Sequence, residues 1–251
     1  MIFVMSTLLI GYTPPVAQGA SVVITDAVQL VDGGAVNERM ASMTSDSEGN
    51  IHVVWSRNTQ HLYYSMLDPR AQTVIDVTQI SNGGGHRAWH PDIDIDSEDR
   101  VHVTWANKAS QHEILYTLLD PSLDDQDGSS ADDGTISIID DTEVSRRQQN
   151  RDWPAIAVDS KDNAHIVWED SFDRHDKYFQ QPQIYYKFLE IDEASREAIT
   201  AIDSTLLTPI IGHKGHPDIA IDADDLVQIA WDDTRGGKVE IVSVIDTSGS
   251  M

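Results

Sequence analysis

The sequence predicts an all-β protein, a β-propeller of four four-stranded antiparallel blades, or four blades of a larger ring. Three observations predict it. One pattern recurs four times along the 251 residues, each copy alternates apolar and polar residues as strands do, and helical periodicity is nearly absent. In every copy a Trp follows an Asp at an offset of nine residues. The four pairs are Asp46 and Trp55, Asp96 and Trp105, Asp159 and Trp168, and Asp222 and Trp231.

Each copy predicts a hairpin, because two β-patterned runs flank a short polar turn rich in Asp, Ser and Gly. A third strand follows each Trp, at residues 62–67, 114–119, 184–189 and 240–245. A fourth strand precedes each hairpin, at residues 27–31, 77–81, 141–145 and 204–208. Only residues 190–200 could form a turn or two of helix.

The strand count indicates how the ring closes. The last copy lacks a fourth strand, and the strand near Ala27 stands before the first hairpin. We expect this segment to pair with residues 239–245, which would leave the ring without an exposed edge. The alternative is that these are four blades of a longer ring whose remainder lies outside this sequence.

A resemblance to a known repeat supports the same fold. The run His-Pro-Asp-Ile-Ala-Ile-Asp at 216–222, followed by Val-Gln-Ile-Ala-Trp at 227–231, resembles the sialidase-like propeller repeats of bacterial and archaeal surface proteins. The resemblance covers residues 22–246 and implies a propeller. It does not extend to the S-x-D-x-G-x-x-W box of sialidases, and no motif marks their arginine cluster and tyrosine nucleophile.

Charge limits the partners. Asp and Glu total 42 against 17 Lys and Arg, so the formal net charge is -25. This field repels nucleic acid and anionic lipid, and leaves a protein or a glycan as the expected ligand. An alternative explanation of the charge is solubility in a salty medium. Cysteine is absent, which excludes thiol chemistry and disulfides.

The N-terminus indicates export. Residues 2–12 are apolar, too short to span a bilayer, and are followed by Thr13-Pro14-Pro15 and small residues up to Ala20. We therefore expect a signal peptide at 1–20, a propeller at 21–246, and a secreted or cell-surface protein without membrane insertion. The alternative is that the apolar run is a buried first strand.

The repeated residues have structural explanations. The four tryptophans are expected to pack between blades. The position three residues before each Trp holds His52, His102, His165 and Gln228, so it requires a hydrogen-bonding group rather than a zinc ligand. The turn acids are expected to cap their own turns, because their spacing does not match a calcium loop.

A candidate ligand site lies where the chain enters each inner strand. Aromatic and basic residues gather there in an otherwise acidic molecule, as a site for a sugar or an anion would require. The alternative is that His-Pro or Trp-Pro only marks the start of a strand. The candidate ligand-binding residues are His90, Trp153, His216, Arg87, Arg151, Lys214, Trp89, Asp92 and Asp218.

The C-terminal residues resemble another family. Asp246, Ser248 and Ser250 match the Asp-x-Ser-x-Ser motif at the start of a von Willebrand factor A domain, which holds Mg²⁺ with hard oxygen ligands. We expect residues 247–251 to be the truncated start of such a domain in a longer chain. The alternative is that the likeness is accidental, because the repeat assigns residues 240–245 to the third strand of its last copy, and in neither case do these three residues form a functional metal site by themselves. No other cofactor is expected, although the acidic loops could hold Ca²⁺ or Mg²⁺ loosely.

These observations predict a non-catalytic propeller that binds a protein or a glycan at the cell surface. The alternative is a glycan-active hydrolase or lyase at the mouth of the channel, with carboxylates such as Asp92 and Asp218 as acid and base. A third possibility is a structural spacer within a larger surface protein.

Overall fold

The computed structural model describes residues 27–31, 37–81, 87–109, 112–124, 136–145, 151–170, 182–192, 194–195, 197–208, 212–233 and 237–244. The predicted signal peptide and the motif Asp246, Ser248 and Ser250 lie outside these residues. No helix in the described ranges is long and apolar enough to cross a membrane.

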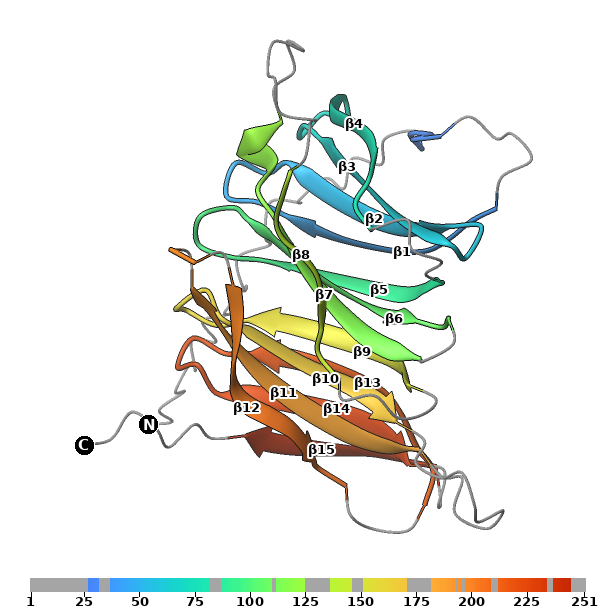
Figure 1. Cartoon of the computed structure of the whole chain (residues 1–251), viewed down its shortest axis with the longest axis vertical. Coiled ribbons are helices and arrows are strands. Elements are labelled where there is room, and N and C mark those ends of the chain that lie inside the picture. The colour runs from blue at the N-terminus through green and yellow to red at the C-terminus, as the bar shows by residue number, and fades with distance from the viewer. Residues whose placement is uncertain are drawn as a thin grey trace, which may run out of the picture.

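The described chain is all-β and folds into four antiparallel sheets, as predicted (Figure 1). Blade 1 consists of β1 (Glu38–Ser45), β2 (Ile51–Arg57), β3 (His61–Leu67) and β4 (Thr73–Gln79). Blade 2 consists of β5 (Ala88–Ile95), β6 (Val101–Asn107), β7 (Glu113–Leu119) and β8 (Ser137–Glu143), with a short 3-10 helix, η1 (Pro121–Leu123). Blade 3 consists of β9 (Arg151–Val158), β10 (Ala164–Asp170), β11 (Gln183–Asp192) and β12 (Glu197–Leu206). Blade 4 consists of β13 (Lys214–Ile221), β14 (Val227–Asp233) and β15 (Lys238–Val244).

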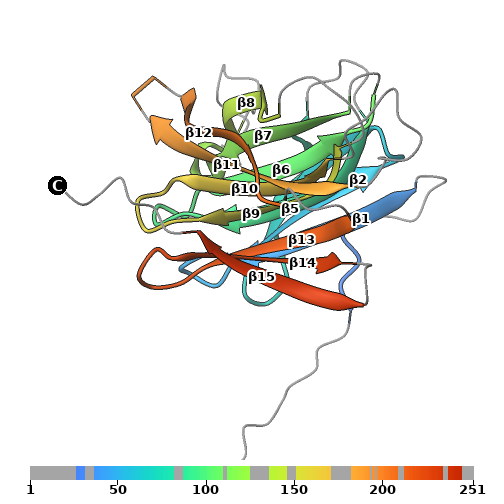
Figure 2. The ribbon, with the colours of Figure 1, turned by 90° about the horizontal axis from the view of Figure 1, so that it is seen from below.

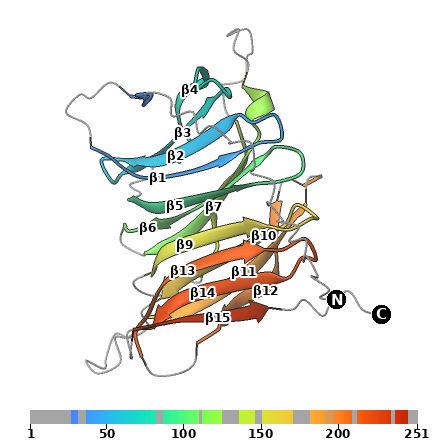
Figure 3. The same cartoon turned by 180° about the vertical axis from the view of Figure 1, so that it is seen from behind.

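The first strands of the four blades lie side by side in the order β1, β5, β9, β13 (Figure 3). Figure 2 shows this stack from the side of blade 4. Neighbouring blades bury three apolar clusters between them, and Trp105, Trp168 and Trp231 each belong to a different one. The four repeated tryptophans are at most 7% exposed, so the prediction that they are buried is confirmed.

The expected pairing between a segment near Ala27 and residues 239–245 is not present among the described residues. Residues 27–31 form no strand, and β15 pairs with β14 alone in the described part of the chain. β1 and β15 lie at opposite ends of the stack (Figures 1 and 3). The sheets are therefore blades, but the described residues do not close them into a ring.

Two strand predictions are corrected. The fourth strands begin several residues earlier than expected, at Thr73, Ser137 and Glu197. The expected helical turn at 190–200 is instead a hairpin between β11 and β12, in which Ile191 pairs with Ala198. Both of these side chains pack on the cluster between blades 2 and 3, and this contact favours the period of two over a helical period.

A repeated contact, which we call the blade clamp, joins successive blades at their turns. A turn serine of one blade donates from its backbone N–H and its hydroxyl to a turn aspartate of the next. The three clamps are Ser47 to Asp99, Ser97 to Asp162 and Ser160 to Asp225. The other turn aspartates, Asp46, Asp96, Asp159 and Asp222, accept from the backbone of their own turns, as expected.

The repeated histidines hydrogen-bond inside their own blades. In blade 2, His102 lies between the carboxylate of Asp96 at 3.1 Å and the hydroxyl of Tyr116 at 3.0 Å. Blades 1 and 3 repeat this arrangement around His52 and His165, while blade 4 has Gln228 bonded to Ser243. The position is thus a structural hydrogen-bonding one, and the part of the chain that the structure describes has no group of three or more His, Asp or Glu arranged to hold a metal ion.

Candidate functional site

The residues predicted to enter the inner strands form one row across the blades. Met40, His90, Trp153 and His216 have φ values of 55°, 45°, 49° and 46°, in the left-handed region that side chains rarely adopt. Each lies at an irregularity in the register between its strand and the next. These features are β-bulges, which bend a strand and redirect a side chain, and backbone strain of this kind is often found at functional sites.

Three of these side chains are in contact, and we call His90, Trp153 and His216 the aromatic row. The rings of His90 and Trp153 are stacked with centroids 3.6 Å apart, and His216 meets Trp153 edge-on at 4.6 Å. Trp153 is 38% exposed, unlike the four buried tryptophans of the repeat. The indole is thus held by two imidazoles and still exposes part of its surface, with which a sugar ring could make contact.

An ion cluster fixes one end of the row. The carboxylate of Asp152 contacts Nδ1 of His90 at 2.7 Å and forms an ion pair with Lys108, which also lies over the ring of Trp89. Burial by itself would raise the pKa of Asp152, but the hydrogen bonds and charges of His90 and Lys108 outweigh it and hold the pKa below its usual range. Asp152 therefore stays ionised and orients His90.

Glu169 lies opposite Asp152 in the ladder between β10 and β9. Burial and, after it, the negative charge of Asp152 raise its pKa, His216 and Lys108 lower it, and together these effects raise the pKa of Glu169 to about 7. Two neighbouring carboxyls thus have pKa values displaced in opposite directions. This is the arrangement by which enzymes keep one carboxyl as a proton donor and another as an anion.

Blade 4 brings a further carboxylate to the same place. Asp232 lies 3.4 Å from Nδ1 of His216 and is paired in the ladder with Gly215. A Cβ at Gly215 would lie 3.0 Å from Oε2 of Glu169 and 3.2 Å from Oδ1 of Asp232. The side chains of Glu169 and Asp232 therefore converge from adjacent blades on the glycine.

The other predicted ligand-binding residues are placed differently. Arg151 and Lys214 are 4% and 1% exposed and form ion pairs with Asp170 and Asp233 within their own blades. Their charged groups are thus engaged in buried ion pairs instead of facing solvent. Arg87 is exposed, and its backbone bonds to Asn107.

The surroundings of Asp92 and Asp218, which the sequence suggested as a possible acid and base, differ from those of the aromatic row. Asp92 accepts from the hydroxyl of Ser42 and the backbone N–H of Ile156, so it links blades 1, 2 and 3. Burial raises the pKa of Asp92. Asp218 is exposed.

Sequence reasoning missed Lys108, Asp152, Glu169 and Asp232. A signal was present in the repeat, at the position directly after each Trp. That position holds Ser56 and Ala106 in the first two copies and Glu169 and Asp232 in the last two. A carboxylate in only two of four equivalent places shows that the repeat itself does not require one there.

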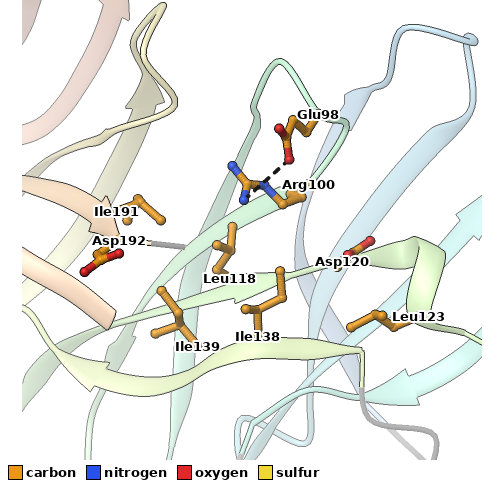
Figure 4. Close-up of a pocket in the computed structure, with 9 residues that line it drawn as sticks. All are labelled: Glu98, Arg100, Leu118, Asp120, Leu123, Ile138, Ile139, Ile191 and Asp192. Carbon is orange, nitrogen blue, oxygen red and sulfur yellow. Dashed lines mark ion pairs between the residues drawn. The ribbon is translucent and has the colours of Figure 1, made fainter. Parts of the chain in front are cut away.

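A separate pocket of about 200 Å³ lies at the other ends of the strands, between blades 2 and 3 (Figure 4). Leu118, Ile139 and Ile191 form its apolar wall, and Glu98, Asp120 and Asp192 bring charge to it. Arg100 is held there by Asp96 at 2.7 Å and by Glu98 at 3.7 Å. The pocket shares no residue with the aromatic row.

Comparisons with known proteins support the fold. The sequence matches no protein-family model and no curated protein. A protein of unknown function from Dyadobacter fermentans is similar in structure, with a TM-score of 0.52 and 8% identity over 84% of this chain and 66% of that one. An ulvan lyase, a polysaccharide lyase, gives a TM-score of 0.51 and 9% identity over 82% of this chain and 56% of its own. An endo-arabinase from Bacteroides thetaiotaomicron gives a TM-score of 0.46 and 14% identity over 84% of this chain and 76% of its own.

These comparisons correct the functional prediction. The expectation of a non-catalytic binding module is contradicted, because the structural neighbours of this chain include a polysaccharide lyase. The neighbours favour the alternative of a glycan-active enzyme over the main prediction. At identities of 8% and 9% this likeness shows the fold alone.

Proposed function

We propose that this protein is a glycan-active enzyme, a hydrolase or a lyase, whose site is the aromatic row and the carboxyls beside it. The observation that carries the proposal is the exposed Trp153 stacked on His90, with Asp152 and Glu169 adjacent and displaced in pKa in opposite directions. A stacking surface and a proton donor at the same place are what cleavage of a sugar polymer needs. The activities of the ulvan lyase and the arabinase are in keeping with it.

Each residue has a distinct part in this proposal. Trp153 binds one face of a sugar ring, and His90, held by Asp152, keeps the indole in place. Glu169 is protonated in an appreciable fraction of molecules near neutral pH and donates its proton to the oxygen that leaves. Burial and the neighbouring Asp152 keep the proton on Glu169 until the substrate is bound.

Export is part of the same proposal. The segment at 1–20 would place the protein outside the cell, where polysaccharides are present. The net charge of -25 keeps such a protein soluble and away from anionic surfaces.

The test uses the full chain and a panel of neutral and anionic polysaccharides. Cleavage is followed by new reducing ends, and by the ultraviolet absorbance of the unsaturated uronic acid that a lyase leaves. Trp153→Ala should raise KM more than it lowers kcat, and Glu169→Gln should lower kcat by about 100-fold or more. Met43→Ala, which removes a 66% exposed side chain of β1 outside the site, is the matched control and should change neither constant.

Calorimetric titration with the same panel distinguishes cleavage from mere binding. Wild-type protein that binds a polysaccharide without ever cleaving it, at any pH between about 5 and 8, would overturn the proposal. Full activity in Glu169→Gln would remove Glu169 from the mechanism.

A further inference from the structure

The most exposed large apolar side chains of the described residues lie at the two ends of the stack of blades (Figures 1 and 3). Val239 and Ile241, on the last strand of blade 4, are 74% and 70% exposed, and Met43, on the first strand of blade 1, is 66% exposed. No described element packs on the outer face of either end blade. Both end blades therefore present an apolar face to solvent.

The equivalent positions of the other blades are buried where successive blades meet. Positions equivalent to Val239 and Ile241 supply the earlier blade of each such junction, and positions equivalent to Met43 supply the later blade. These residues are at most 9% exposed and are Leu62, Ile114, Ile184, Tyr64, Tyr116 and Tyr186 in the earlier blades, and Ile93, Ile156 and Ile219 in the later ones. Blade 4 thus ends in one half of a junction, and blade 1 begins with the other half.

A carboxylate on the exposed face of blade 4 has an equivalent that binds the following blade. Asp92 of blade 2 accepts a hydrogen bond from the backbone N–H of Ile156 in blade 3, at 3.0 Å. Asp218 of blade 4 is equivalent to Asp92, and Met43 of blade 1 is equivalent to Ile156. Asp218 is exposed and lies on the same face as Ile241, because both pair with Ala230. A blade 1 packed on this face would supply the missing donor.

The two end faces also carry opposite charges at one matching place. A Cβ at Gly215 of blade 4 would lie 3.0 Å from Oε2 of Glu169 in blade 3, so these two positions are neighbours across a junction. Arg39 of blade 1 is equivalent to Gly215, and Asp232 of blade 4 is equivalent to Glu169. Arg39 is exposed. Packing blade 1 on blade 4 would therefore bring a guanidinium and a carboxylate together.

We propose that two copies of this chain bind one another head to tail, with the exposed face of blade 4 of each copy on the exposed face of blade 1 of the other. Each contact repeats the apolar and polar pairs of the junctions within the chain. Two such contacts join eight blades into one ring, a number within the range of closed propellers.

The contact between copies lacks the blade clamp, because Ala223 and Gly49 occupy its donor and acceptor positions. It is therefore weaker than the junctions within the chain, and association should depend on the protein concentration. Each copy carries a net charge of -25, so added salt should favour association by screening the repulsion between copies.

Sedimentation velocity and light scattering of the full chain test the proposal, at ionic strengths from about 0.15 M upward. The mass should rise with concentration to twice 27.8 kDa. Ile241→Asp and Met43→Asp should each weaken association by about 100-fold or more, because each buries an unpaired charge in the contact. Ile199→Asp, at a 45% exposed position of β12 on neither end face, is the matched control and should associate like the wild type.

A mixture of the two variants distinguishes a head-to-tail contact from a contact between like faces. Met43→Asp keeps the blade 4 face intact, and Ile241→Asp keeps the blade 1 face intact. An equimolar mixture should therefore form one junction, and hence a dimer that neither variant forms alone. If Met43→Asp dimerised by itself while Ile241→Asp did not, two copies of β15 would pair with one another and the head-to-tail contact would be wrong.

Charge reversal tests the polar pair. Arg39→Asp and Asp232→Arg should each weaken association, and the double variant Arg39→Asp/Asp232→Arg should recover much of it, because opposite charges face one another again. Circular dichroism and the melting temperature show whether each variant is folded. A double variant that associates no better than either single variant would contradict the placement of Arg39 beside Asp232.

A wild type that sediments as one copy at every concentration and ionic strength would overturn the proposal, whatever other segment or blade covers the two faces. The inference does not depend on the proposed function, because Trp153 and Glu169 lie on blade 3 and belong to neither end face. Failure to cleave any polysaccharide would leave the association standing, and failure to associate would leave the proposed enzyme standing.

Discussion

Ser97 donates two hydrogen bonds to Asp162, from its backbone N–H at 2.8 Å and from its hydroxyl at 2.9 Å, and so joins blade 2 to blade 3. The same clamp joins blades 1 and 2 and blades 3 and 4. The equivalent acceptor position in blade 1 is Gly49, and the equivalent donor position in blade 4 is Ala223. Neither residue can form the contact by its side chain, so blades 1 and 4 cannot be clamped to one another.

Removing one clamp should weaken the contact between two blades. Asp162→Ala deletes the acceptor of both bonds from Ser97 and should lower the free energy of unfolding by about 1 kcal/mol, since water still reaches the group. Urea denaturation measures the change. Asp224→Ala, at an exposed turn residue of blade 4, should stay within about 0.5 kcal/mol of wild type. Equal stability of the two variants would show that the clamp contributes nothing.

A buried repeat tryptophan should be far more costly to remove than the exposed one. Trp168 is 1% exposed and packs in the cluster between blades 2 and 3, so Trp168→Ala should destabilise by about 3–5 kcal/mol. Trp153→Ala, at a 38% exposed position, is the comparison and should melt close to the wild-type temperature. If Trp168→Ala melted like wild type, the packing between these blades would not depend on this side chain.

The histidine position of the repeat can be tested by removing one hydroxyl. Tyr116 and His102 are both fully buried, and Tyr116→Phe leaves Nδ1 of His102 without its partner. The expected loss is about 1–3 kcal/mol, the cost of a buried polar group that has lost its hydrogen bond. Tyr63→Phe, whose hydroxyl makes an exposed contact with Gln79, is the matched control and should have little effect. Thermal unfolding of the two variants and the wild type measures these losses of stability.

Activity should fall as the pH rises through about 7, because Glu169 then loses the proton that it donates. Asp152→Asn removes a charge that raises the pKa of Glu169, so the fall should begin at a lower pH. Lys108→Met removes a charge that lowers this pKa, so the fall should move to a higher pH. The pH profile of kcat/KM measures both shifts, and shifts in the same direction would contradict the assignment.

Acid should destabilise the fold partly through Asp159. Burial raises its pKa, but hydrogen bonds from His165 and Asn163 outweigh burial and lower the pKa from 3.8 to about 2. The folded pKa lies below the unfolded one, so this contribution is complete above about pH 4 and is lost as the pH falls towards 2. Asp159→Asn should reduce the slope of stability against pH in this window, measured by denaturation at several pH values. An unchanged slope would exclude Asp159 as a source of the acid sensitivity.

Much of the fold could be predicted from the repeat. The constant offset from Asp to Trp predicts the hairpins, and the structure has them at all four places. The ends of the fourth strands could not be predicted, because these strands alternate weakly and pair only with the third strand of their blade. The predicted closure of the ring was inferred from the number of strands. The number of strands does not determine how far β1 lies from β15.

The site was predictable in part. His90, Trp153 and His216 share a position in the repeat, and a repeated position must fall on one line across stacked blades. Arg151 and Lys214 lie two residues earlier, and their burial against Asp170 and Asp233 depends on which way each side chain leaves a bulged strand. A charge pattern alone cannot show that orientation.

By itself, the sequence determined the blade as the unit, its hairpin, its buried tryptophan and the row of residues that enter the inner strands. These features are local or repeat at a fixed offset, so they follow from short-range pairing and the alternation of side chains. Only the tertiary structure decided that Glu169 and Asp232 meet over Gly215, that Asp152 orients His90, and that the described blades form an open stack. Those relationships join residues of different blades, and their distances are set by how the sheets pack on one another.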